Sequence, residues 1–149
     1  MSEEIVIRFA RHDDLDFAYQ DGYISAKILK SKIEAQIALN PDCIEDVVIA
    51  EWNGKRVGYV RLEYLWSIVP YISLIHVLPD YRRQGVGKAL LRFIETFLRE
   101  AGHEALYSSS QVDEPEPQAW HRHVGFEECG FIAGINERVG EVFFRKSLR

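Results

Sequence analysis

A short segment, Arg82–Lys88, combines basic side chains with two glycines in a pattern suited to holding a phosphate group. Gly85 and Gly87 allow the backbone to approach a ligand closely. The apolar residues that follow recur at helical spacing, so a helix is predicted to begin at this point. Amides in the first turn of a helix lack an intrahelical acceptor and, together with the helix dipole, favour an anion. The segment therefore predicts an anion site suited to a pyrophosphate.

Two other phosphate-binding patterns fit this segment poorly. The Walker loop needs glycine five residues before Gly87 and serine or threonine after Lys88, where this chain has Arg82 and Ala89. The dinucleotide fingerprint needs a third small residue where Leu90 stands, and it opens the first strand–turn–helix unit of a chain rather than lying past its middle. A glycine-rich turn can also serve only to make a tight corner between a strand and a helix.

The longer run Val77–Gly87, Val-Leu-Pro-Asp-Tyr-Arg-Arg-Gln-Gly-Val-Gly, resembles the signature of the GNAT superfamily of acyl-CoA-dependent N-acetyltransferases. Residues 119–126 and the pair Gly130-Phe131 resemble the late helix of that family and its exit into a strand. The resemblance covers essentially the whole chain. It implies acetyl-CoA as cosubstrate and direct acetyl transfer to a primary amine in a ternary complex, since no cysteine is placed to carry the acyl group.

The resemblance also implies which residues contact the cofactor. In the family, backbone groups near Val77 bind the pantetheine arm and polarise the acetyl carbonyl. The expected cofactor-binding residues are Val77, Leu78, Arg82, Arg83, Gln84, Gly85, Val86, Gly87, Lys88 and Ala89.

The general base is one point at which the chain departs from the family. Many members carry an acid midway along the central strand, where this chain has Ser73 and Leu74. His76 is one candidate, because imidazole titrates near physiological pH, but strand alternation puts it on the same face as Leu74, as a core or cleft-lining histidine would be. Glu63 on the neighbouring strand is a second candidate and can equally be a solvated or substrate-binding carboxylate. A relay of water molecules is the third alternative.

The proton donor is the other departure. Many family members carry tyrosine five residues before the phenylalanine corresponding to Phe126, and this chain has His121 there. Histidine can protonate a thiolate, so His121 is the predicted donor; the alternative is that it only caps the pocket. An asparagine common in the family is replaced by Glu114. The departures motivate a second hypothesis, a catalytically weak or inactive acetyl-CoA-binding module with a sensor or regulatory role.

The elements around these residues indicate an α/β (α+β) domain. Asn53-Gly54 is a strong hairpin signal between two apolar strands, and the run 71–78 is apolar enough for a strand buried on both faces. The resemblance implies a GNAT-like mixed, mostly antiparallel sheet of six to seven strands with helices on both faces. The predicted strands are 5–9, 47–52, 57–63, 71–78, 105–109, 128–133 and 141–147. A first helix is predicted to begin near Asp13 and to break at Gly22, and a second to run from about Ala26 and stop at Asn40. Further helices are predicted from about 86 to Gly102 and over 119–123, and residues 113–117 are predicted to be an irregular loop.

Length and composition limit the possible functions. The 149 residues suit one domain over 1–149, and 47% hydrophobic with 28% charged residues is an ordinary globular composition. The acidic start of the chain shows no secretory signal or membrane-spanning segment, so a cytoplasmic protein without membrane partners is expected. A net charge of −5 argues against nucleic acid and is compatible with a cationic substrate.

The sequence and the family resemblance also give expectations for the partners of the chain and for metal binding. The expected substrate is a small-molecule amine or a peptide amine, and the family resemblance makes a homodimer plausible. No metal is expected, because His121 and His123 stand two apart on a predicted helix and point to different sides. Cys43 and Cys129 are predicted to be incidental thiols.

Overall fold

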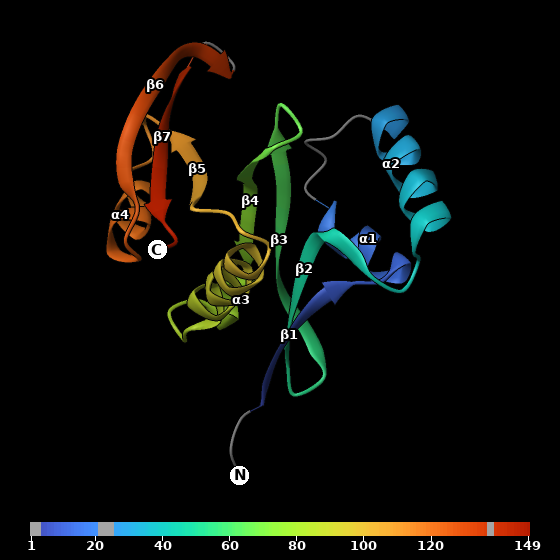
Figure 1. Cartoon of the computed structure of the whole chain (residues 1–149). Coiled ribbons are helices and arrows are strands. Elements are labelled where there is room, and N and C mark those ends of the chain that lie inside the picture. The colour runs from blue at the N-terminus through green and yellow to red at the C-terminus, as the bar shows by residue number, and fades with distance from the viewer. Residues whose placement is uncertain (1–3, 21–25, 137–138) are drawn as a thin grey trace. The chain divides into compact units, whose positions relative to one another are not determined.

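The computed structural model describes residues 4–20, 26–136 and 139–149. Hydrogen-bonded neighbours in the seven-stranded sheet follow the order β1 (Ile5–Ala10), β2 (Ile44–Trp52), β3 (Lys55–Leu65), β4 (Val69–Val77), β5 (Ala105–Gln111), β7 (Val139–Ser147) and β6 (Glu127–Asn136). The pairs β1–β2, β2–β3, β5–β7 and β6–β7 are antiparallel, whereas β4 and β5 are parallel. Four α-helices accompany the strands in the described residues (Figure 1). The predicted mixed, mostly antiparallel sheet is therefore confirmed, with seven strands.

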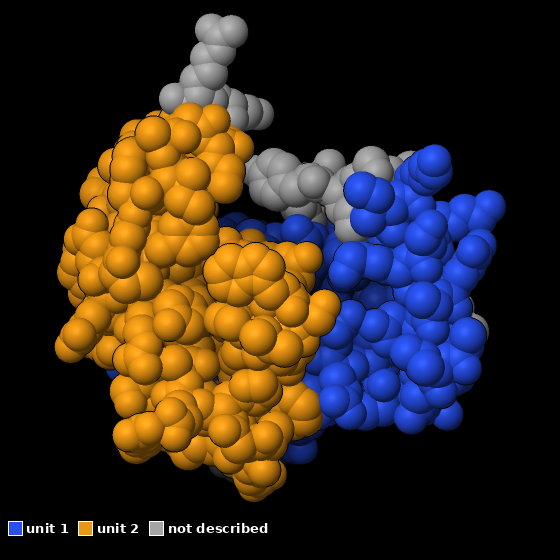
Figure 2. Space-filling model, turned by 45° about the horizontal axis from the view of Figure 1, so that its top comes forward, with its two compact units in different colours: residues 1–62, 74–93 blue, residues 63–73, 94–149 orange. Residues whose placement is uncertain are grey.

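The chain divides into two compact units (Figure 2). The first unit comprises residues 1–62 and 74–93, and the second comprises 63–73 and 94–149. The elements in chain order are β1 (Ile5–Ala10), α1 (Leu15–Ala18), α2 (Ala26–Leu39), β2 (Ile44–Trp52), β3 (Lys55–Leu65), β4 (Val69–Val77), α3 (Val86–Glu100), β5 (Ala105–Gln111), α4 (Pro115–His123), β6 (Glu127–Asn136) and β7 (Val139–Ser147). No helix in the described part of the chain has the length and apolar character needed to cross a membrane.

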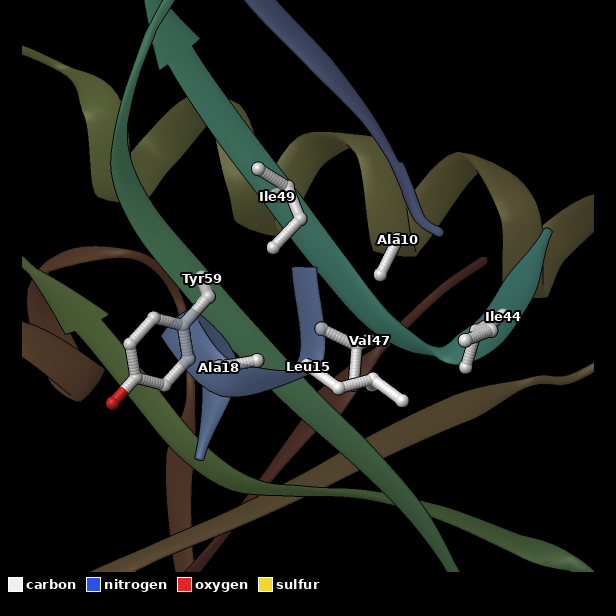
Figure 3. Packing of buried hydrophobic residues seen from close by; sticks show 7 residues of the cluster. All are labelled: Ala10, Leu15, Ala18, Ile44, Val47, Ile49 and Tyr59. Atoms are coloured by element: carbon white, nitrogen blue, oxygen red, sulfur yellow. The ribbon is translucent and has the colours of Figure 1, made fainter. Parts of the chain in front are cut away.

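A hydrophobic core cluster of the first unit lies between α1 and the strands β1, β2 and β3 (Figure 3). Val47 and Ile49 are two residues apart on β2, so both side chains point to the same face of the sheet, and both belong to the cluster that contains Leu15 of α1. The predicted hairpin joins β2 to β3, and Asn53 and Gly54 have the positive φ angles of +49° and +84° that its two-residue turn requires.

One prediction about the second unit is wrong. Residues 113–117 are not an irregular loop throughout, because α4 begins at Pro115. Proline is tolerated in the first helical turn, where its missing N–H would have no intrahelical acceptor. Gln118 ties the start of α4 to the end of β5, because its side-chain amide nitrogen, Nε2, donates to the carbonyls of Gln111 and Val112 at 3.1 and 3.0 Å.

A buried carboxylate ties the start of α1 to the sheet of the first unit. Asp14 is 3% exposed and accepts two hydrogen bonds from Arg8, at 2.7 and 3.2 Å, and one from the Arg11 amide at 2.9 Å. Arg56 approaches the same carboxylate at 3.3 Å, and Arg8 also bonds Glu51 at 2.7 Å. Burial alone would raise the pKa of Asp14, but these hydrogen bonds and charges outweigh it and lower the pKa to about 2.

Replacing Asp14 by asparagine tests this network. A pKa near 2, against the ordinary 3.8, makes the folded state more stable by about 2 kcal/mol at pH 7. This contribution is complete above the ordinary pKa and is lost as the pH falls through about 2. We expect Asp14→Asn to lower the free energy of unfolding in urea at pH 7, and the difference from the wild type to shrink by roughly half at pH 3.

The matched control is Asp16→Asn, which removes an ion pair to Arg56 at 3.6 Å from a side chain that is 79% exposed. Exposed pairs contribute little, so a change below about 1 kcal/mol is expected. A difference between Asp14→Asn and the wild type that is the same at both pH values would contradict the assignment.

Candidate active site

The anion-binding segment of the first unit follows the end of β4. Leu78 donates its backbone N–H to Val57 of β3 at 2.8 Å, and Arg82 Nε donates to the carbonyl of Val77 at 2.8 Å. Arg83 and Gly85 adopt left-handed backbone conformations, with φ of +62° and +89°. Glycine adopts this conformation without strain, whereas arginine does so at some cost, and such strained residues concentrate at functional sites.

The first turn of α3 presents backbone donors beside these side chains. The first hydrogen bond of the helix runs from the Ala89 N–H to the Gly85 carbonyl at 3.0 Å. No carbonyl one turn earlier in the helix is therefore available to the backbone N–H groups of Val86, Gly87 and Lys88. The arrangement matches the predicted anion site, because these N–H groups carry the positive end of the helix dipole.

Positive charge is added to this turn by exposed side chains. Arg82, Arg83 and Lys88 are exposed, and within the described ranges none of them pairs with a carboxylate. Gln84 is held by a bond from its side-chain amide to the Asp80 carbonyl at 3.0 Å. Three cations and a helix amino end are donors of the kind that bind a pyrophosphate strongly.

A glycine that the sequence analysis missed sets the position of α3. A Cβ atom on Gly58 of β3 would lie 3.0 Å from the His76 carbonyl oxygen and 3.4 Å from side-chain atoms of Val86 and Leu90. Hydrogen at this position therefore lets β4 and the first turns of α3 approach β3. Glycine inside an apolar strand is a recognised sign of close backbone approach, and that signal was present in the sequence.

His76 packs toward the core of the first unit. Its ring lies 5.4 Å from the ring of Tyr59, a fully buried residue, and Leu74 also packs against that core. The two side chains share one face of β4, as the strand alternation predicts. Any role of His76 as a base must operate from this half-buried position beside Tyr59.

His121 is enclosed within the second unit. It is 3% exposed, and its ring stacks on Phe144 with centroids 4.6 Å apart. Nδ1 lies 2.7 Å from the Pro117 carbonyl oxygen and Nε2 lies 2.7 Å from Ser108 Oγ. A carbonyl only accepts hydrogen bonds, so Nδ1 carries the proton of the neutral ring and Nε2 accepts from the Ser108 hydroxyl.

The surroundings of His121 favour its neutral form. Burial lowers the pKa of His121 and the nearby charge of Arg122 lowers it further, whereas the hydrogen bond to Pro117 acts in the opposite direction. Ser108 was missed by the sequence analysis. Ser108 belongs to the serine run 108–110 in a strand whose alternate residues are buried, and this pattern could have indicated a buried serine.

Glu63 is exposed near the end of β3 and belongs to the second unit. Its neighbour Tyr71 bonds Ser109 Oγ at 2.5 Å. Burial raises the pKa of the Tyr71 hydroxyl, and the charges of Glu141 and Glu63 raise it further, while the hydrogen bond with Ser109 acts against them. This arrangement is compatible with a substrate-binding role for Glu63 as well as with that of a base.

The predicted residues thus fall into separate surroundings. All the expected cofactor contacts, from Val77 to Ala89, lie together in the first unit, with His76 beside them in the chain. Glu63 and His121 lie in the second unit, the first near Tyr71 and the second against Ser108. Among the residues described, no group of three or more His, Cys, Asp or Glu side chains is placed to hold a metal ion.

Sequence comparison identifies relatives of this chain. The model of the acetyltransferase (GNAT) family matches residues 8–131. An aminoglycoside N(6')-acetyltransferase type 1 from Stenotrophomonas maltophilia is 36% identical over 104 residues, which make up 64% of this chain and 62% of that protein. The chain spans about three-fifths of the length of the aminoglycoside N(6')-acetyltransferases that it matches at 36% and 32% identity.

Solved structures share the fold. The ribosomal-protein-S18-alanine N-acetyltransferase from Escherichia coli superposes with a TM-score of 0.74 and 20% identity, over 97% of this chain and 94% of that one. A Bacillus anthracis protein described as a streptothricin acetyltransferase, solved in complex with acetyl coenzyme A, gives a TM-score of 0.63 and 22% identity, over 68% and 61%.

Replacing Gly87 by leucine tests the anion site. Gly87 is the second residue of α3, and its φ is not positive, so a leucine there favours the helix by up to about 1 kcal/mol. The added side chain should nevertheless keep a pyrophosphate away from the first-turn amides. We expect calorimetric titration to show CoA binding weakened by at least about tenfold, or about 1.4 kcal/mol.

Gly130→Ala serves as the control, because Gly130 has no positive φ and a Cβ atom there meets nothing within 4 Å. Its CoA affinity and its melting temperature should equal those of the wild type. Wild-type affinity in Gly87→Leu would show that CoA does not use the first turn of α3.

Proposed function

Because the chain belongs to the acetyltransferase (GNAT) family, we propose that it is an N-acetyltransferase that moves an acetyl group from acetyl-CoA to a primary amine by direct transfer in a ternary complex. The observation that carries the proposal is the amino end of α3, where unbonded first-turn amides adjoin Arg82, Arg83 and Lys88. These groups suit the pyrophosphate of CoA. Acetyl-CoA bound to the Bacillus anthracis neighbour supports the same cosubstrate.

The proposed acceptor is a small molecule with a primary amine. Several curated relatives are aminoglycoside N(6')-acetyltransferases, and another is a streptothricin acetyltransferase, which favours this class over a peptide amine. A chain with a net charge of −5 attracts cationic molecules by long-range electrostatics.

Acetyl transfer requires the amine to lose its proton before it attacks the thioester. An alkyl ammonium such as that of lysine has an ordinary pKa of about 10.4, so a base or a water relay must take the proton near neutral pH. His76 and Glu63 remain the proposed bases, and a water relay remains the alternative to both. No Cys carries the acyl group in this scheme.

The departing thiolate needs a proton, and we assign its delivery to His121 acting through Ser108. Neutral His121 has its one ring proton on Nδ1, where it bonds Pro117. It can therefore exchange protons only at Nε2, which faces the Ser108 hydroxyl at 2.7 Å. For this route, Nε2 first takes up the proton that the amine loses, and it then donates that proton to Ser108 Oγ as the serine hydroxyl gives its own proton to the thiolate. Ser108 Oγ is therefore the atom that meets the thiolate.

Assembly and location complete the proposal. β6 is exposed at nearly every position and forms one end of the strand order, with Phe131 and Ile135 among its exposed apolar residues. Such an edge can pair with another chain, so a homodimer through β6 is proposed. A cytoplasmic location is also proposed, because the proposed reaction consumes acetyl-CoA and the cytoplasm supplies it.

The first test measures thiol release from acetyl-CoA with a panel of amines, together with calorimetric CoA binding on the same sample. The panel contains kanamycin A, spermidine, lysine amide and a peptide with a free N-terminus. We expect CoA binding and turnover with at least one small-molecule amine. CoA binding without turnover on any amine would favour the sensor hypothesis, and absence of CoA binding would contradict both hypotheses.

Ser108→Ala tests the proton route. We expect kcat to fall by about 10²-fold, in the range typical of a lost proton-transfer group, while KM for acetyl-CoA is unchanged. Ser108→Thr keeps the hydroxyl and should restore most of kcat. Both variants are compared by melting temperature, because an unpartnered His121 Nε2 costs about 1–3 kcal/mol of stability. A Ser108→Ala enzyme with the wild-type kcat and pH profile would show that His121 is not the donor.

A further inference from the structure

A chain of hydrogen bonds in the second unit ends at a carboxylate that the mechanism above does not use. Tyr71 of β4, Ser109 of β5 and Glu141 of β7 are linked by bonds of 2.5 Å between the two hydroxyls and 2.8 Å from Ser109 Oγ to Glu141 Oε2. Asn136, the last residue of β6, donates to Glu141 Oε1 at 2.5 Å. Four strands therefore contribute to one polar cluster.

We propose that Glu141, with Glu63 nearby, binds the ammonium groups of a polycationic acceptor and so determines which amines this enzyme accepts. The inference rests on the proposed function, because it names a subsite for the acceptor of that reaction. It assigns to Glu141 a role in recognition and not in the chemical step.

The direction of the hydrogen bonds fixes the carboxylate and leaves it able to accept more. Glu141 only accepts, so Ser109 donates to it, and Tyr71 must then donate to Ser109. The ring of Tyr71 is held by Phe143, with centroids 6.0 Å apart and an interplanar angle of 27°. Each oxygen of Glu141 receives one hydrogen bond from a neutral group and keeps a lone-pair direction for another donor.

The charge of Glu141 is not balanced within the described residues. Neither Glu141 nor Glu63 forms an ion pair with a described Lys, Arg or His side chain, and Glu141 is half-buried. Arg145, on the same face of β7, stands beyond Phe143 and contributes no ion pair to either carboxylate. A partly desolvated carboxylate held only by neutral donors is stabilised when a cation binds beside it.

A second observation points to a missing donor at the same place. The side-chain oxygen of Asn136, Oδ1, is buried and has no hydrogen-bond partner in the described structure. Buried polar atoms nearly always have a partner, so an unpartnered acceptor indicates a ligand or an ordered water. An ammonium has three N–H donors, and Glu141, Asn136 Oδ1 and the Tyr71 oxygen offer acceptors from three side chains.

The cluster lies on the face of β5 opposite to the face of Ser108. Side chains alternate along a strand, so Ser109 points away from the face on which Ser108 meets His121 of α4. Figure 1 shows β5 beside β7, and their register pairs Gln111 with Glu141 and Ser109 with Phe143. The two faces of β5 therefore separate the proposed amine subsite from the buried pair Ser108 and His121.

A polycation fits this site better than a monoamine. A carboxylate beside an ammonium stabilises its charged form, so the ammonium that Glu141 holds is not the amine that reacts. The acceptor must then carry at least two amino groups, one bound here and one acetylated. The two carboxylates that act on Tyr71, Glu141 and Glu63, suit a molecule with several ammonium groups.

The test uses Glu141→Gln in the full chain, which removes the charge and keeps the shape. Binding of kanamycin A and of spermidine is measured by calorimetry without acetyl-CoA, and KM and kcat are measured with acetyl-CoA. We expect each affinity to fall, and each KM to rise, by at least about tenfold, with kcat within about threefold and CoA binding unchanged. Glu63 is also a proposed base, so Glu63→Gln is used in the calorimetric binding measurement alone, where a smaller loss of polyamine affinity is expected.

Two controls separate recognition from structure. Glu128→Gln removes an exposed carboxylate of β6 that pairs with Arg122 at 3.6 Å, and it should leave both affinities unchanged. Glu141→Asp keeps the charge and should restore part of the lost affinity. Melting temperatures identify any variant that does not fold. If Glu141→Gln does not fold, the test rests on Glu141→Asp and on Ser109→Ala, which removes a hydrogen bond to the carboxylate. Both of these variants must then bind the polyamines more weakly than the wild type.

The outcomes distinguish the inference from the proposed function. Wild-type polyamine affinity in Glu141→Gln, or no binding of either polyamine by the wild type, overturns the inference even when CoA binds and another amine is acetylated. Loss of polyamine binding in Glu141→Gln in a protein that binds no CoA would support the cation site and contradict the proposed enzyme.

Discussion

The packing of α3 against β3 at Gly58 is the contact on which the candidate cofactor site depends. A helix amino end binds an anion only if its first amides point to one place and stay there. Val86 and Leu90 reach the Gly58 backbone, and the His76 carbonyl approaches it from β4. A Cβ atom at this position would press on the His76 carbonyl oxygen at 3.0 Å, so the contact is as close as it is because residue 58 is glycine. The direction of the Val86, Gly87 and Lys88 amides is therefore set by a residue far from them in the sequence.

Local signals were sufficient to predict the turn and the elements around it. The apolar run of β4, the proline that follows it and the helical spacing of α3 are properties of neighbouring residues, and Gly85 shows the left-handed conformation that only glycine adopts without strain. The start of α4 could not be read in this way, because Pro115 and Pro117 suit a loop and a first helical turn equally. Contacts of Gln118 with the end of β5 decide between the two.

The candidate catalytic groups were less predictable for the same reason. The position of His121 in the family pattern suggested a proton donor, but its hydrogen bond to Ser108 depends on how α4 lies on β5. The cluster of Tyr71, Ser109 and Glu141 joins three strands and has no local sequence signal at all. Ser108 and Ser109 are consecutive in one strand and acquire different partners because successive side chains point to opposite faces. Ser108 faces the histidine and Ser109 faces the carboxylate.

Acetyl transfer to a polyamine is favoured when the carboxylates that bind ammonium groups lie apart from the place where the reacting amine loses its proton. Binding an ammonium and deprotonating an amine make opposite demands, since a carboxylate that stabilises the charged amine also makes its proton harder to remove. If Glu141 and Glu63 hold ammonium groups that do not react, the reacting amine can lie away from them, in surroundings that favour its neutral form. Glu63 then serves recognition better than base catalysis. The choice of base narrows to His76, in its half-buried position beside Tyr59, or to a water relay.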